Sequence, residues 1–167
     1  YNVNCQTIDK CPNNLRMSIE KDISQLRKFN SEHHKVIVNL IFTNSWVTEK
    51  LKQHFESKDL TLQQFNILRI LRGSNGPIST LQIRDRMLDK MSDTSRIVDR
   101  LVLKNLARKV VNKNDKRLVD VTITAKGKNL LANLDKTQTM IDEIVHNLNS
   151  EEAKQLNSLL DKIRGSV

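Results

Sequence analysis

Apolar residues change their spacing in the middle of this chain, from the period of a helix to the period of a strand. Before residue 107 they recur mostly every three or four positions, as on one face of an α-helix. Residues 107–112 read as a strand, KNDK as a turn, and the segment from Arg117 to Ile123 alternates with Val119, Val121 and Ile123 on one face. The change predicts a mainly α-helical protein with one small β-hairpin.

Helical spacing accounts for the first part of the chain. The long stretch Val36–Phe55 has apolar residues on one face over several turns, and a shorter helical stretch, Ile19–Phe29, precedes it. A further helix is predicted over Thr61–Arg72. The sequence GSNGP at Gly73–Pro77 is typical of a stop and a turn, because glycine and proline interrupt regular structure.

Two short helices are predicted between this turn and the hairpin. Ser79 is the expected N-cap of the first, because Gln82 follows three residues later and completes a capping box. Ser92 or Asp93 is the expected N-cap of the second. That helix is expected to end near Asn105, a residue that tolerates the left-handed conformation found at helix C-termini.

Two more helices are predicted after the hairpin. Thr124 is the expected cap of a long helix whose apolar positions continue to Leu148, and Ser150 is expected to start the last one. Glu151 and Glu152 suit the positive end of that helix dipole. The first long helix and these last two have larger apolar faces than a small three-helix core needs. This excess favours a subunit interface; packing of the helices on one another within a monomer is the alternative.

Positive charge is concentrated in one part of the chain. The whole chain has a net charge of +9, and the segment from Arg84 to Lys128 accounts for +7 of it, because this segment contains 13 Lys or Arg and 6 Asp. Such asymmetry favours an anionic partner, most often nucleic acid, over a basic surface that is merely solvated.

Two short helices joined by a few residues form a helix-turn-helix unit, whose second helix enters the major groove of DNA. Ile97, Val98 and Leu101 are expected to face the core, and Arg96 is placed to reach a guanine edge or a phosphate. Nearby carboxylates are expected to orient the arginines or to repel phosphate. The residues predicted to contact DNA from this helix are Ser92, Asp93, Thr94, Ser95, Arg96, Asp99 and Arg100.

A β-hairpin that follows the second helix of a helix-turn-helix unit, the helix that reads DNA, is called a wing. Its turn holds Lys113, Asn114, Lys116 and Arg117, and a cationic tip of this kind is suited to phosphates or to the minor groove. Asp115, two residues before Arg117, is expected to pair with it and fix its direction. The alternative is a hairpin with a solvated basic surface.

The sequence resembles the MarR family of bacterial winged helix-turn-helix transcription regulators, in three segments. Leu60–Leu71 (LTLQQFNILRIL) is similar to the helix before the helix-turn-helix, and Ser95–Leu106 (SRIVDRLVLKNL) to the recognition helix and its exit. Asp115–Gly127 (DKRLVDVTITAKG) is similar to the family wing with its D-x-R pair. The chain departs from the family at Asn105, where glycine is usual. With its flanking helices, the resemblance spans Ser18–Arg164.

The resemblance implies a sequence-specific regulator of transcription that binds double-stranded DNA as a homodimer. A repressor acting at a palindromic operator is the expected form, because two reading heads at a fixed spacing match a two-fold symmetric site. The expected organisation is an extension over residues 1–16, N-terminal dimerisation helices over 17–58, the winged helix-turn-helix over 59–124, and C-terminal dimerisation helices over 125–167. No cofactor is expected.

Many members of the family release DNA when a small aromatic ligand binds between the dimer body and the reading head. Phe42, Trp46 and Phe65 are candidates for lining such a pocket, although aromatic residues at these spacings belong more often to the core. Cys5 and Cys11 precede the matched region, so the cysteine-based oxidant sensing of other members does not carry over. No metal site is expected.

Two other functional classes are alternatives to DNA binding. One is a winged-helix module whose wing binds another protein; the local charge of +7 argues against it. The other is an enzyme, for which the sequence lacks a glycine-rich phosphate loop, a G-x-S-x-G elbow and a paired metal motif. No apolar run long enough to span a membrane and no apolar leader are seen, so a cytoplasmic protein is expected.

Overall fold

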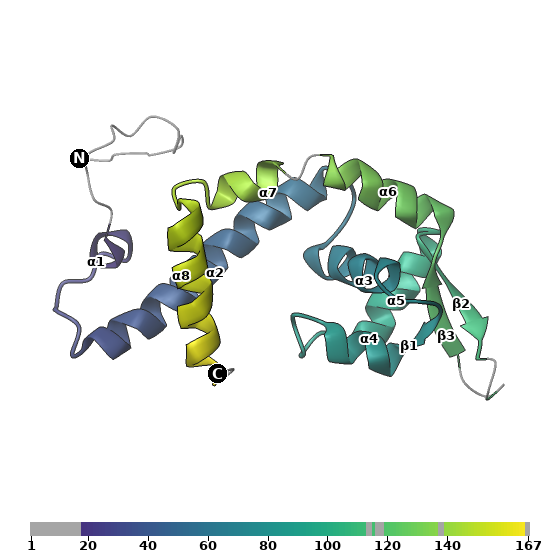
Figure 1. Cartoon of the computed structure of the whole chain (residues 1–167), viewed down its shortest axis with the longest axis horizontal. Coiled ribbons are helices and arrows are strands. Elements are labelled where there is room, and N and C mark those ends of the chain that lie inside the picture. Colours follow the sequence, from purple (N-terminus) through teal and green to yellow (C-terminus); the bar gives the residue numbers. More distant parts are fainter. Residues whose placement is uncertain (1–17, 113–114, 116–118, 137–138, 166–167) are drawn as a thin grey trace. The chain divides into compact units, whose positions relative to one another are not determined.

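The computed structural model describes residues 18–112, 115, 119–136 and 139–165. The chain forms two compact units, one ending at Trp46 and the other beginning at Val47. Its elements, labelled in Figure 1, are α1 (Ile19–Asp22), α2 (Glu32–Glu56), α3 (Leu62–Arg72), β1 (Ile78–Ser79), α4 (Thr80–Arg86), α5 (Thr94–Leu103), β2 (Ala107–Val111), β3 (Val119–Ile123), α6 (Ala125–Asp135), α7 (Thr139–Ile144) and α8 (Ser150–Ile163).

The first unit holds α1 and the start of α2. The prediction of a helix as far as Phe29 is wrong, because α1 ends at Asp22 and Ser24 adopts a left-handed backbone with φ of 52°. The next apolar side chain, Leu26, is 99% exposed, so no burial stabilises a further turn. Glu20 accepts an ion-pair hydrogen bond from Lys35 at 2.7 Å. This bond holds the pKa of Glu20 below its ordinary value and raises the pKa of Lys35.

The second unit contains the winged helix-turn-helix, which runs from α3 to β3 and is called the head below. In it, α3, α4 and α5 pack with a small sheet. Figure 1 shows the sheet beside α4 and α5, and α5 contacts both α3 and β2. Helical periodicity supplies the core, since each helix contributes one buried apolar stripe. Fully buried side chains of this core include Phe55, Ile67, Leu68, Ile83, Val98, Leu101, Val121 and Leu131.

The sheet has three antiparallel strands in the order β1-β3-β2. The hairpin of β2 and β3 confirms the predicted wing strands, with Ala107 opposite Ile123. Strand β1 was not predicted, because it has two residues and forms only by pairing with β3 far along the chain. Val121 is buried, but Val119 on the same face is 48% exposed. The buried face therefore ends before the outer part of the wing.

Local capping fixes where the head's two short helices begin. Ser79 Oγ accepts the N–H of Gln82 at 3.2 Å and Gln82 Oε1 accepts the N–H of Ser79 at 2.9 Å, which confirms the predicted capping box. Asp93, of the two candidates, caps α5 by accepting the N–H of Arg96 at 3.1 Å. After α5, Asn105 has φ of 59°, the left-handed conformation that its sequence position predicts.

The predicted long helix after the wing is two helices, α6 and α7. Thr124 caps α6 as predicted, but the described helix ends at Asp135, where the Arg72 guanidinium of α3 pairs with the Asp135 carboxylate at 2.5 Å. The last helix, α8, begins at Ser150 as predicted, and Asn149 caps it, because the Asn149 side-chain oxygen accepts two backbone N–H groups, at 2.9 and 3.0 Å.

The carbonyl of Leu106 joins the exit of α5 to the start of α6. Its oxygen accepts the N–H of Thr124 at 3.1 Å, and the Thr124 hydroxyl lies 3.1 Å from it and 2.8 Å from the Asn105 carbonyl. The N–H of Gly127 in turn donates to that hydroxyl at 3.1 Å. A Cβ on Gly127 would lie 2.3 Å from the Leu106 oxygen and 2.8 Å from a side-chain carbon of Ile123. Only glycine allows this approach.

We expect Gly127→Ala to lower the free energy of unfolding by roughly 1–3 kcal/mol, the usual cost of overpacking, even though alanine favours a helix. Urea denaturation followed by circular dichroism measures the change. Gly76→Ala is the control, because its Cβ would have no neighbour within 4 Å. Equal stability of the two variants would show that the junction tolerates a side chain.

Candidate nucleic-acid interface

The outer face of α5 carries polar side chains on a helix that the core holds in place. Val98 and Leu101 are fully buried, and this burial leaves Ser95, Arg96 and the later polar positions exposed, as the sequence predicts. Asp99 and Arg100 are exposed as well. Thr94, which was predicted to contact DNA, is instead buried, with 5% of its surface exposed. It follows that Thr94 belongs to the support of the helix rather than to its outer face.

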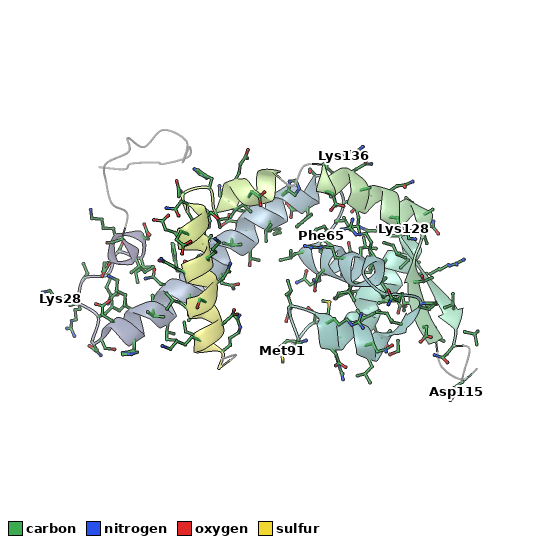
Figure 2. The ribbon with its side chains drawn as sticks, viewed as in Figure 1. Lys28, Phe65, Met91, Asp115, Lys128 and Lys136 are labelled. Carbon is green, nitrogen blue, oxygen red and sulfur yellow. The ribbon has the colours of Figure 1, made fainter. Side chains whose placement is uncertain are left out.

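The connection between α4 and α5 is fixed by hydrogen bonds to Asp89. The hydroxyl of Ser92 donates to one carboxylate oxygen at 2.6 Å and the N–H of Met91 donates to the other at 3.0 Å. These bonds, that of Ser92 first, hold the pKa of Asp89 below its ordinary value. Ser92 is therefore half-buried and engaged within the turn, while the Met91 side chain protrudes from it (Figure 2).

Two carboxylates, one at the N-cap of α5 and one within the helix, form ion pairs with basic side chains on its outer side. Asp93 Oδ2 lies 3.5 Å from Nε of Arg96, which agrees with the expected orientation of an arginine. Asp99 Oδ1 lies 2.6 Å from Nζ of Lys109 on β2. Sequence analysis missed Lys109, because a pairing between a helix and a strand depends on packing that no local pattern reveals.

A groove of about 470 Å³ lies between the start of α4, α5 and the wing strands. Its walls combine hydroxyl groups, one ammonium group and aliphatic side chains. The residues that line it are Ser79, Thr80, Leu81, Ser95, Lys109, Val119 and Val121. A second hollow of about 240 Å³ shares Thr80, Leu81 and Ser95 with it and adds Arg84. Donors and cations therefore line the hollows beside the first turn of α5.

The wing is anchored at its base by a buried carboxylate. Asp120 on β3 is 8% exposed and accepts a hydrogen bond from the Asn112 amide at 2.7 Å. The Asn112 side-chain oxygen accepts the N–H of Asp115 at 3.0 Å. Asp115 lies at the end of the hairpin far from α6 (Figure 2). The predicted DNA-contacting residues Lys113, Asn114, Lys116 and Arg117 lie outside the described residues, so the pairing of Asp115 with Arg117 stays a prediction.

The three aromatic candidates for a ligand pocket belong to different units. Phe42 and Trp46 are exposed side chains of α2 in the first unit. Phe65 belongs to the second unit, where its ring stacks on Phe55 at 4.4 Å between centroids. The guanidinium of Arg69 lies 5.8 Å from the centre of the same ring. Phe65 thus contributes to the packing of the head.

In the part of the chain that the structure describes, no group of three or more His, Cys, Asp or Glu side chains is placed to hold a metal ion. None of the described helices is both long and apolar enough to cross a bilayer.

Comparison with known proteins gives the same family in sequence and in structure. The model of the MarR family matches residues 58–118, which hold α3 to β2. The multiple antibiotic resistance protein MarR of Salmonella typhimurium is 29% identical over 115 residues, covering 68% of this chain and 79% of that protein. The chain is therefore similar to the MarR family over these residues.

Solved MarR-family structures share the fold. A mutant of MarR from E. coli, crystallised with operator DNA, superposes with a TM-score of 0.72 at 24% identity, covering 82% of this chain and 99% of that one. Bordetella bronchiseptica BpsR, whose DNA binding is regulated by 6-hydroxynicotinic acid, gives 0.67 at 22% identity, covering 75% and 89%. The fold of this chain is therefore that of MarR winged-helix regulators.

Proposed function

We propose that this protein is a sequence-specific regulator of transcription of the MarR family, a dimeric repressor that binds a palindromic operator in double-stranded DNA. The observation that carries the proposal is the outer face of α5, where Arg96 and Arg100 are exposed on a helix fixed by buried Val98 and Leu101. Arginine at such a position is the side chain that most often reads a guanine edge in the major groove. The operator-bound E. coli neighbour supports the assignment.

Electrostatics supports the same face. Exposed cations lie on α5 itself, at Arg96 and Arg100, and beside it on α4 and β2, at Arg84 and Lys109. Phosphate contacts release counterions, so DNA affinity should fall steeply with salt. Selection of bound sites from random duplex DNA tests the proposal, and a palindrome is the expected result. Equal, negligible retention on DNA at low and at high salt would favour a protein-interaction module instead.

We expect Arg96→Ala to weaken binding to the selected site by about 1–3 kcal/mol and to relax preference at one base of each half-site. Fluorescence anisotropy on the selected site and on single-base variants measures both effects. Arg27→Ala is the matched control, because it removes the same charge from an exposed position in the first unit. Unchanged affinity and preference in Arg96→Ala would show that α5 is not the reading helix.

Dimerisation through helices of residues 17–58 and 125–167 is part of the proposal. Helix α2 exposes Val36, Ile37 and Ile41, and α8 exposes Leu156, Leu159 and Ile163. Apolar side chains that recur along one helix face and remain exposed in a single chain are typical of an interaction surface. A second copy of the chain is the partner that a two-fold symmetric operator requires.

We expect Leu159→Lys to shift the protein from dimer to monomer, because a buried ammonium group without a partner opposes association. Sedimentation velocity at several protein concentrations measures the shift. Leu88→Lys is the control: Leu88 is also an exposed leucine, but it lies on the connection between α4 and α5. A Leu159→Lys variant that sediments as the wild type would exclude this face of α8 from the interface.

Release from DNA by a small aromatic ligand completes the proposal. The structural neighbour BpsR supports this part of the proposal, because its DNA binding is regulated by 6-hydroxynicotinic acid. The candidate lining residues in the first unit are Phe42 and Trp46. Because Trp46 is the single tryptophan of the sequence, its fluorescence reports on the first unit without labelling. We expect an aromatic acid that releases DNA to change this fluorescence in the wild type; release without any change would remove Trp46 from the pocket.

A further inference from the structure

We propose that Asp99 determines specificity by holding Lys109, so that the protein binds non-operator DNA more weakly than its positive charge alone would allow. The inference rests on the proposed DNA binding and deepens it. It concerns a pair that joins α5 to the wing strand β2, with Asp99 Oδ1 2.6 Å from Nζ of Lys109. No local sequence pattern pairs these residues.

The pair lies beside the hollow next to the reading helix. Ser95 and Asp99 are four residues apart on α5 and so share one helix face. Ser95 and Lys109 both line the groove of about 470 Å³. Lys109 is therefore among the cations that a DNA backbone approaching the first turn of α5 would meet.

The pair is accessible, with 56% of the Asp99 side chain and 47% of the Lys109 side chain exposed. An exposed ion pair of this kind is weak and is screened by salt, so a phosphate can compete for the lysine. The competition has a cost, because Asp99 loses its partner and then faces the phosphates as an unpaired negative charge. A like charge of this kind discriminates against partners that offer no compensating contacts.

Operator and random DNA differ in that compensation. On an operator, base contacts from Arg96 and Arg100 hold the head on the DNA, so the Asp99–Lys109 pair can stay intact and the cost does not arise. On random DNA only phosphate contacts are available, so binding there depends on freeing Lys109 and bears the cost of the broken pair. Asp99 is thus expected to widen the ratio between operator and random affinity.

The test compares Asp99→Asn with the wild type as full-length proteins, on the selected site and on a random duplex over a range of salt. The free lysine should tighten binding to random DNA about two- to fivefold, the range of an exposed pair. It should also steepen the salt dependence by about 0.9, the value for one added phosphate contact. Affinity for the selected site should rise less, so the discrimination ratio should fall.

Two controls isolate the mechanism. Glu56→Gln makes the same charge change in an exposed pair with Lys52 on α2 and should leave DNA binding unchanged. Asp99→Asn in a Lys109→Gln background should tighten random binding less than it does in the wild type, because only the repulsion of the carboxylate is then removed and no lysine is freed. If it tightens random binding as much as in the wild type, Asp99 acts by long-range repulsion and the inference is overturned.

Stability provides the remaining distinction. If Asp99→Asn lowers the thermal midpoint but leaves affinity, salt slope and discrimination unchanged, the pair is only a brace between α5 and β2, which overturns the inference. Failure of the proposed function looks different, because the wild type itself would then show no salt-dependent retention on any duplex.

Discussion

The position of α5 depends on the carbonyl of Leu106. This group accepts the N–H of Thr124 at 3.1 Å and lies where a Cβ of Gly127 would fall. One hydrogen bond and one missing side chain therefore bring together the exit of α5, the end of β3 and the first turn of α6. The left-handed turn at Asn105 makes the meeting possible, because it reverses the chain immediately before Leu106.

Beyond this junction, α5 has one face that packs in the core and an opposite face that carries polar side chains. Residues of α5 that point inward, Val98 and Leu101, contact the core, and the outward residues carry the charges. Thr94 shows how closely the two regions meet, because it lies within the first turn of α5 and is still buried. The proposed DNA-reading surface is consequently narrow, and its direction is determined by burial on the opposite side of the same helix.

Local signals were enough to predict the parts of the fold that local energetics decides. The capping box at Ser79, the cap at Thr124 and the left-handed Asn105 each need only a few neighbouring residues. Strand β1 exists only through its pairing with β3, so its two residues carry no strand signal of their own.

The remaining departures also arise from context. The early end of α1 agrees with the 99% exposure of Leu26, and periodicity alone cannot supply that information. At the candidate site, periodicity gave the outward face of α5, although the predicted DNA contacts also included the buried Thr94. It gave no indication of the contact between Asp99 and Lys109, which is created by the packing of β2 beside α5.

In the proposed DNA-binding function, the ion pairs along α5 have a consequence for how fast the protein finds its operator. A DNA-binding protein searches by sliding and hopping, and the time spent at each wrong position grows with its electrostatic attraction to the backbone. Arg96 and Lys109 each have a carboxylate partner within the protein. A head that partly neutralises its own cations leaves wrong sequences sooner, and so it examines more of the genome in the same time.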